Sequence, residues 1–390
     1  MIRALDRRTM LAGTLALGAG SVAMPRMAFA QTPGERNMLL VVLRGAADGL
    51  AMLAPTGDPD FARLRSGVLP DYQGAQKADD FFTIHPAFEL VGKAFGEGDA
   101  LFVHATATSY RERSHFDGQN MLETGGNAPF AKRDGWLNRL VGLMPRGGTG
   151  EPPKALAVAP TIPLALRGDA PASSYAPSAL PQASNDFLNR VSRLYERDEQ
   201  LGSLWMRALE TQEMANADHL RNMRDARAVG ELAASLMRDE GGARIGMIEF
   251  GGWDSHANQR RVFQRQAGQL DAALGAFRTS MGSTWAKTMV LVVTEFGRTV
   301  RYNGTGGTDH GTAGAALLMG GSVNGGRVMA DWPGLADSHL YEGRDLRPTI
   351  ALESVISGAI AEHFELAPKA TMANLFPDRR TNALGGFMRG

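Results

Sequence analysis

Short, mostly apolar runs recur along the chain and predict a set of buried strands. They are MLLVVL (38–43), ALFVHATAT (100–108), RIGMIEF (244–250), MVLVV (289–293) and AALLMGG (315–321). A run that is apolar throughout is expected of a central strand covered on both faces. Amphipathic helical patterns stand between these runs, at 81–95, 264–277 and 349–364. The alternation predicts one large α/β domain over residues 31–390.

Two further stretches break this alternation. Residues 154–166 suggest a strand or edge segment interrupted by prolines. After a Pro/Ala/Ser-rich linker near 168–184, residues from about 185 to 240 are rich in Leu, Arg, Glu, Met and Ala at helical spacing. We interpret this second stretch as a helical insertion that caps the domain.

The first thirty residues are typical of an export signal of the twin-arginine type. Arg7 and Arg8 precede a Gly/Ala-rich apolar run, and Ala28 and Ala30 fit a small-residue cleavage site before Gln31. The apolar run is short and rich in glycine, which disfavours a stable membrane anchor. We therefore expect a periplasmic or secreted protein whose partner during export is the twin-arginine translocation machinery.

Composition limits the chemistry that the chain can perform. Lys plus Arg and Asp plus Glu number 41 each, so the formal charge is zero and no basic surface for nucleic acid is indicated. The chain has no cysteine, which excludes disulfides, thiolate metal sites and cysteine nucleophiles. Any metal ion must be held by oxygen and imidazole ligands.

Polar residues follow or, for Asp309 and His310, directly precede the predicted strands, at the edge where an open α/β sheet places its binding crevice. They are Asp48, Asp254, His256, Glu295, Arg298, Asp309 and His310. Carboxylates and imidazoles gathered there are typical of a metal site or an acid–base pair. Each motif is weak alone. Asp48 is equally a turn residue before Gly49. For Asp309 and His310, the alternative to a functional role is a capping residue beside a hydrogen-bonded histidine.

Ser114 is predicted to cap a helix that begins near His115. A hydroxyl at that position faces free backbone N–H groups and the positive end of the helix dipole, which together favour an anion. Arg111 and Arg113 add donors for a phosphate-like or sulfate-like group. The alternative is that Ser114 only caps the helix.

Taken together, the segments LRGAADGL, RSHFDGQ, GGWDSH, TEFGRT and TDHGTAG resemble an uncharacterised family of exported twin-arginine proteins, a domain of unknown function. That family is similar to the alkaline phosphatase–sulfatase superfamily, and the resemblance extends over residues 36–375. It implies an alkaline-phosphatase-like three-layer α/β sandwich with a mostly parallel central sheet and a helical insertion. It also implies a metal site with a Ser or Thr nucleophile at a helix N-terminus.

The resemblance also implies roles for individual residues. Those assigned to one metal are Asp254, His256 and His310. Those assigned to the other are Ser114, as the nucleophile, and Glu295, together with Asp48, which would lie between the two metals. Asp309 is either a ligand or orients His310. The pattern departs from the phosphatases at Phe296, where they usually carry histidine, and in the close spacing of Asp254 and His256. The cysteine nucleophile of the sulfatases is absent.

These residues predict a periplasmic metal-dependent hydrolase of phosphoesters or related anionic esters. The expected cofactor is one or two divalent metal ions. The residue types do not identify the metal, which could be Zn, Mn, Mg or Ca. Arg113 or Arg298 would bind the non-reacting oxygens of a small anionic ester substrate. A non-catalytic exported metal-binding or scaffold protein of the same fold is the alternative. Metal-free serine chemistry is a third possibility, but it leaves the converging carboxylates without a cation to hold them together.

Overall fold

The computed structural model describes residues 36–145, 153–176 and 225–389, with scattered positions between 188 and 208. The predicted export signal at 1–30 lies outside the described residues, and so does most of the predicted insertion at 185–240. The end of that stretch is described as helix α9 (Ala226–Met237). Among the described residues, no helix is both long and apolar enough to cross a lipid bilayer.

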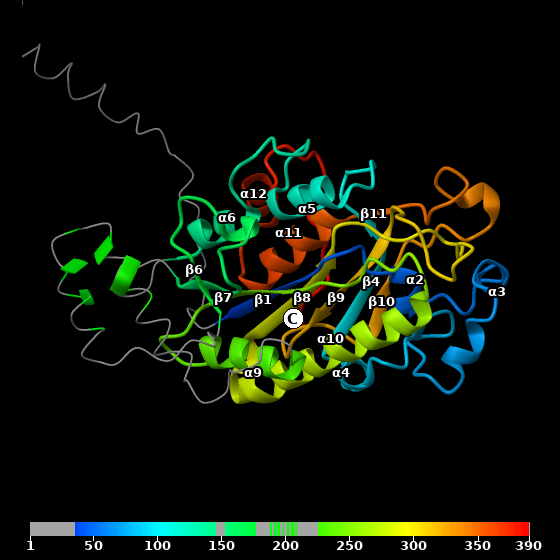
Figure 1. Cartoon of the computed structure of the whole chain (residues 1–390), viewed down its shortest axis with the longest axis horizontal. Coiled ribbons are helices and arrows are strands. Elements are labelled where there is room, and N and C mark those ends of the chain that lie inside the picture. The colour runs from blue at the N-terminus through cyan, green and yellow to red at the C-terminus, as the bar shows by residue number, and fades with distance from the viewer. Residues whose placement is uncertain are drawn as a thin grey trace, which may run out of the picture. The chain divides into compact units, whose positions relative to one another are not determined.

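A nine-stranded sheet forms the centre of the fold (Figure 1). Its strands run in the order β10-β4-β9-β8-β1-β7-β5-β6, and β11 pairs with β4. The strands are β1 (Asn37–Leu43), β4 (Ala100–Ala107), β5 (Ala155–Val158), β6 (Ser173–Tyr175), β7 (Ile245–Phe250), β8 (Thr288–Thr294), β9 (Gly314–Met319), β10 (Arg327–Met329) and β11 (Ile350–Ala351). Only β9 is antiparallel to its neighbours within this sheet. A separate antiparallel pair joins β2 (Leu53–Ala54) and β3 (Thr83–Ile84). The mostly parallel sheet confirms the predicted α/β fold.

Helices cover both faces of the sheet (Figure 1). One layer contains α4 (Glu89–Gly96), α9 and α10 (Gln259–Met281). The other contains α5 (His115–Thr124), α6 (Trp136–Leu143), α11 (Leu352–His363) and α12 (Pro368–Leu375). The short helices α2 (Gly49–Met52) and α3 (Phe61–Leu64) follow β1.

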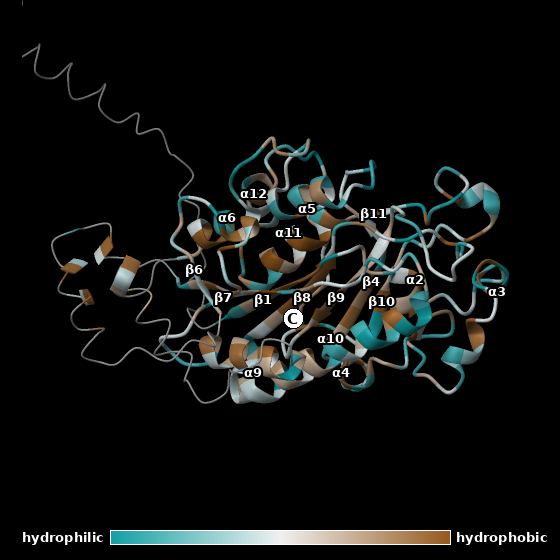
Figure 2. Cartoon of the chain, viewed as in Figure 1, coloured by the Kyte–Doolittle hydropathy of each residue, from teal (hydrophilic) through white to brown (hydrophobic). Residues whose placement is uncertain are grey.

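Strand β1 explains why two helical layers are needed. Leu39, Val41 and Leu43 pack with the first layer, whereas Met38, Leu40 and Val42 pack with the second. Successive side chains of a strand point to opposite faces, so a run that is apolar throughout must be covered twice. Figure 2 shows central strands in mainly hydrophobic colours, with helices of mixed hydrophobic and hydrophilic colour on either side of them.

Strand direction brings the predicted functional loops together. The carboxyl ends of β1, β4, β7 and β8 lie at one edge of the sheet, because these strands are parallel. Antiparallel β9 begins at that same edge, so the loop before it joins the loops that leave the other four. Residues far apart in the sequence therefore meet there, as the polar pattern predicted.

Two histidines are part of the core rather than of this edge. His104 Nε2 donates to the carbonyl of Leu53 at 3.1 Å, and His104 Nδ1 accepts from the N–H of Ala105 at 2.7 Å. His363 Nε2 donates to the carbonyl of Asn37 at 2.9 Å. Burial lowers the pKa of His104 to about 4 and that of His363 to about 3. Both rings are therefore neutral in the folded protein.

We expect these histidines to make the fold sensitive to acid. Because their pKa values are lower in the folded chain than the value near 6.5 of the unfolded chain, the unfolded chain binds more protons below that pH. Their contribution to stability is complete above pH 6.5 and is lost as the pH falls toward 4 and then 3. Urea unfolding at a series of pH values should show this slope.

His363→Gln keeps a donor near the carbonyl of Asn37 but cannot take up the proton, so it should make the slope shallower. Ile360→Val, in the same buried helix, is the control. It should lower the free energy of unfolding by about 1 kcal/mol at every pH without changing the slope. An unchanged slope in His363→Gln would contradict the assignment.

Candidate metal centre

Four side chains from three loops converge at the carboxyl edge of the sheet. His115 begins α5, Asp254 and His256 follow β7, and His310 precedes β9. The Nε2 atom of His310 lies 3.0 Å from Nε2 of His115 and 3.0 Å from Nε2 of His256. Asp254 Oδ1 lies 3.2 Å from His310 Nε2 and 3.0 Å from His256 Nε2, and its Oδ2 lies 3.4 Å from His115 Nε2. We call these four residues the histidine–aspartate cluster.

Each of the three imidazoles is held from behind by an oxygen acceptor. His115 Nδ1 lies 2.8 Å from Oε1 of Glu295, and His256 Nδ1 lies 3.3 Å from Oδ1 of Asp309. His310 Nδ1 lies 2.9 Å from the carbonyl oxygen of Arg113. A carbonyl or a carboxylate can only accept, which assigns the ring proton to Nδ1 in all three histidines.

The Nε2 atoms are then three lone-pair acceptors that face one another and a carboxylate. In such an arrangement the acceptors are joined either by a proton on one of the rings or by a cation at the centre. Ligand bonds of about 2.0–2.1 Å around a tetrahedral ion place neighbouring ligand atoms about 3.3 Å apart. The shortest separations in the cluster, 3.0–3.4 Å, lie near that value, and the ligand atoms of His115, Asp254 and His310 all lie within 4.8 Å of one another. Oxygen acceptors on the far side of ligating histidines are also usual at metal centres.

Close backbone approach makes the cluster possible. Gly45, after β1, has a φ of +112°, and a Cβ atom there would lie 2.6 Å from the nitrogen of Asp254. A Cβ atom at Gly118 would lie 2.9 Å from the ring of Phe296, so this glycine lets α5 pack directly on that ring. Phe296 in turn stacks on His115, with ring centroids 5.0 Å apart. Both glycines therefore help to set the position of the cluster.

Burial and hydrogen bonding set the charges around the cluster. Burial alone would raise the pKa of Glu295, but hydrogen bonds from His115, Gln119 and the N–H of Gly45 hold this pKa below its usual value. The hydrogen bond to Glu295 in turn raises the pKa of His115. Burial lowers the pKa of His310, which favours the neutral imidazole that a metal ion requires.

Arg298 holds the carboxylate of Asp254 in place through a hydrogen bond and an ion pair. The Arg298 side chain is fully buried, and its guanidinium donates to Asp254 Oδ1 at 2.8 Å. Burial would raise the pKa of Asp254, but the hydrogen bond and charge of Arg298 lower it. Arg298 also donates through Nε to Thr308 Oγ1 at 3.0 Å. Arg298 therefore orients the aspartate, whereas the sequence analysis expected it to bind substrate.

Asp48 lies behind the cluster in the same hydrogen-bonded network. Thr308 Oγ1 donates to Gln259 Oε1, and Gln259 Nε2 donates to Asp48 Oδ2. Arg65 forms a buried ion pair with Asp48, with NH1 2.6 Å from Oδ2. Asp48 was expected to bind metal, but the structure places it against an arginine instead.

Arg113 and Ser114 stand beside the cluster. The Arg113 guanidinium contacts Asp345 at 2.9 Å and also pairs with Glu342, so its charge is taken up by carboxylates. Its carbonyl accepts from His310, which places Ser114 one peptide bond from a cluster contact. Ser114 is the N-cap of α5 as predicted, but its hydroxyl makes no capping hydrogen bond. Its backbone N–H donates to the hydroxyl of Tyr110 at 3.1 Å.

No curated protein has a matching sequence. One family does match, under the description "Protein of unknown function (DUF1501)", over residues 73–372. The chain belongs to the DUF1501 family. The matched region of this DUF1501 chain contains the entire histidine–aspartate cluster. The expected membership of an uncharacterised family is therefore confirmed.

Several solved structures resemble this DUF1501 chain loosely. The C-terminal periplasmic domain of EcEptC from Escherichia coli, in complex with Zn, has 7% identity, covers 74% of each chain and has a TM-score of 0.39. Phosphonate monoester hydrolase of Agrobacterium radiobacter has 12% identity, covers 85% of this chain and 74% of its own, and has a TM-score of 0.40. Alkaline phosphatase from the Antarctic bacterium TAB5 has 10% identity, with coverage of 90% and 100% and a TM-score of 0.37. Because the sequence identities and TM-scores are this low, these similarities assign no function to any residue of this chain.

His115 is the member of the histidine–aspartate cluster that was not predicted from the sequence. It was treated only as the start of a helix, whereas its ring points to His310 and Asp254. Its place in the first turn of a helix that follows a strand was a usable signal, because that turn lies at the carboxyl edge of the sheet. Glu295 and Asp309 were expected as ligands, and Asp309 alternatively as the partner of His310. In the structure, Glu295 holds His115 and Asp309 holds His256.

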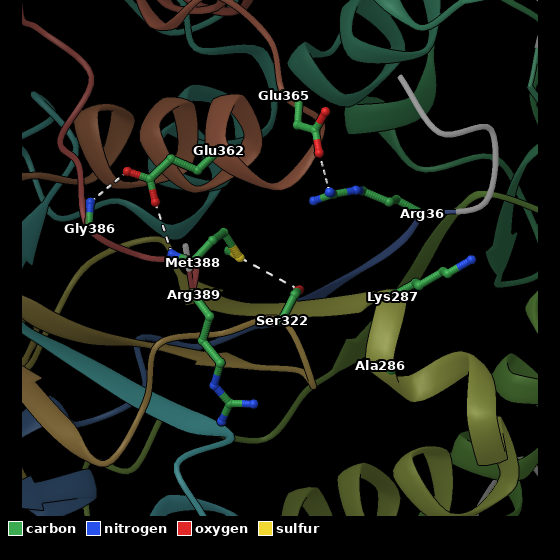
Figure 3. A pocket seen from close by; sticks show the side chains of 9 residues that line it. All are labelled: Arg36, Ala286, Lys287, Ser322, Glu362, Glu365, Gly386, Met388 and Arg389. Carbon is green, nitrogen blue, oxygen red and sulfur yellow. Dashed lines mark hydrogen bonds and ion pairs between the residues drawn. The ribbon is translucent and has the colours of Figure 1, made fainter. Parts of the chain in front are cut away.

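A separate pocket of about 590 Å³ lies at the opposite edge of the sheet, next to Arg36 and Lys287, which directly precede β1 and β8 (Figure 3). Within it, Arg36 pairs with Glu365. Glu362 accepts from the backbone N–H of Met388 at 2.9 Å. These contacts hold the C-terminal segment against α11. We therefore interpret the residues that line this pocket as structural.

We predict that the cluster binds Zn²⁺ and that its outer partners tune the affinity. His310→Ala removes the imidazole that contacts the other three members, and it should weaken binding by more than about 100-fold. Glu295→Gln should weaken it by about 10–100-fold, because a carboxylate behind a ligating histidine strengthens that ligand. Competition with a chromogenic chelator measures both effects.

His339→Ala is the matched control, because His339 is an exposed histidine in the 3₁₀ helix Asp337–His339. It should bind Zn²⁺ as the unaltered chain does. Equal affinities in His310→Ala and His339→Ala would show that the cluster is not the metal centre.

Proposed function

We propose that this chain is an exported metal-dependent hydrolase of phosphoesters or related anionic esters, with Ser114 as the nucleophile. The observation that carries the proposal is the convergence of three Nε2 acceptors on Asp254 next to Ser114. The side chains of Asp254 and His256 are 42% and 48% exposed, so a substrate in solution can reach the centre. The N-terminal sequence supports export to the periplasm.

The donor set favours one class of ion. Three imidazole nitrogens and one carboxylate suit zinc better than magnesium or calcium, which prefer ligand sets made of oxygen. The residues that would hold the ion are His115, Asp254, His256 and His310. When bound, it would supply positive charge that polarises an ester oxygen and stabilises the charge developing in the transition state.

The chain's own groups would position and attack the ester. The first turn of α5 offers free backbone N–H groups to an anionic group, next to the Ser114 hydroxyl. Ser114 Oγ would form a bond to phosphorus as the bond to the leaving oxygen breaks, and the serine proton would pass to solvent. Water would then release phosphate from the serine. The hydroxyl of Tyr110 accepts a hydrogen bond from the backbone N–H of Ser114 and so keeps Ser114 in place.

A metal-binding protein without turnover is the second candidate. It is favoured by the guanidinium groups of Arg113 and Arg298, which are already paired with carboxylates and so do not offer their charge to a substrate. Both candidates require the cluster to bind an ion. They differ in whether the metal-loaded chain turns over phosphate mono- and diesters or sulfate esters.

Ser114→Ala should remove hydrolysis, by on the order of 10³-fold or more, because the group that forms the covalent intermediate is gone. The metal content should stay that of the unaltered chain, since the proposed ligands remain. Ser235→Ala is the matched control, because Ser235 hydrogen bonds only within α9 on the other side of the sheet. Rates are compared on a panel of phosphate and sulfate esters. Full activity in Ser114→Ala would reject the nucleophile.

A further inference from the structure

Asp48 has no oxygen left for a metal ion. Its Oδ2 accepts from Arg65 NH1 at 2.6 Å and from Gln259 Nε2. Its Oδ1 accepts from Arg65 NH2 at 3.2 Å and from the N–H of Leu50 at 3.1 Å, which caps α2. The residue is only 2% exposed, so rearrangement toward solvent would require the loop to open.

Arg65 is a buried arginine whose charged guanidinium is held in one position by its hydrogen bonds. It is 1% exposed, and Nε donates to the carbonyl of Val300 at 2.6 Å while NH2 donates to that of Thr299 at 2.8 Å. Its guanidinium also lies 4.8 Å from the ring centroid of Tyr302. With Asp48 as the counter-ion, a full set of partners surrounds the arginine.

Glu295 is likewise committed to the protein. Its Oε1 accepts from the N–H of Gly45 at 2.8 Å, from His115 and from Gln119. Its Oε2 lies 3.0 Å from the Thr294 hydroxyl, whose one proton also faces the carbonyl of Leu43 at 2.8 Å. Phe296, which stands where related phosphatases are expected to carry histidine, places an apolar ring against His115. Among the described residues, the one group of metal-binding side chains found contains His115, Asp254 and His310.

We infer that this chain holds a single divalent cation, in the histidine–aspartate cluster, and that the guanidinium of Arg65 supplies the positive charge next to Asp48 that a second cation was expected to supply. The inference rests on the proposed metal centre and narrows it to one ion. The second site does not fit the residues present, because both of its expected carboxylates already have protein donors. A divalent ion beside Asp48 would also face the buried charge of Arg65.

The count of bound ions tests this inference on the unaltered full-length protein. The chain is stripped with a chelator, saturated with ZnCl₂, dialysed and analysed by elemental mass spectrometry, with isothermal titration of Zn²⁺ as a second count. One ion per chain is the expected result. Two tightly bound ions would overturn the inference and leave the proposed hydrolase standing. No bound ion would overturn both.

A pair of substitutions identifies the residues involved. In Arg65→Met combined with Asp48→Asn, both buried charges are removed together, which avoids leaving one of them unpaired. At saturating Zn²⁺ this variant should still bind one ion, whereas His310→Ala should bind none. Loss of the ion in a folded double variant, checked by circular dichroism, would overturn the inference that the cluster holds its ion without a contribution from Asp48. If the double variant does not fold, the count on the unaltered chain still decides.

Discussion

The arrangement at the carboxyl edge depends on the fixed direction of three imidazole rings. Each ring is bound through Nδ1 to an oxygen that can only accept, and so each directs its Nε2 toward the other members of the cluster. The oxygens come from Glu295, Asp309 and the carbonyl of Arg113. Glu295 and Asp309 lie in the connection between β8 and β9, and Arg113 lies in the loop before α5, so the cluster forms only when the sheet has brought both segments to one edge. Fold and site are therefore coupled through hydrogen bonds on the far side of the rings.

The charges around the cluster follow a simple division. Carboxylates that are buried have protein donors, as Asp48 has Arg65 and Glu295 has His115. Asp254 has the buried Arg298 on one side and solvent on the other, so its negative charge is only partly compensated. The partly compensated carboxylate is the one that joins the histidines. This division explains why a set of acidic residues that looked equivalent in sequence takes different roles in three dimensions.

Much of the fold was predictable from sequence, because strands buried on both faces leave continuous apolar runs. Strands β1, β4, β7, β8 and β9 all correspond to such runs. The convergence of Asp254, His256 and His310 was likewise predictable, since strand ends meet at one edge. What the sequence could not show is which carboxylate pairs with which cation. Asp48 and Arg65 lie in separate loops, and no periodic pattern marks their contact. His115 was missed because its ring direction depends on how α5 packs against Phe296.

Phe296 shows how one side chain limits the number of ions that such a site can hold. A histidine at that position would add a ligand beside Glu295, whereas the phenyl ring adds none and stacks on His115 instead. Gly118 leaves space for that ring, so α5 and the loop after β8 are fitted to each other. With the aromatic ring in place, His115 contacts Glu295 through Nδ1 and directs Nε2 toward Asp254 and His310. The phenyl ring, which offers no ligand atom of its own, thus fixes the orientation of His115, and this favours a centre built around one cation.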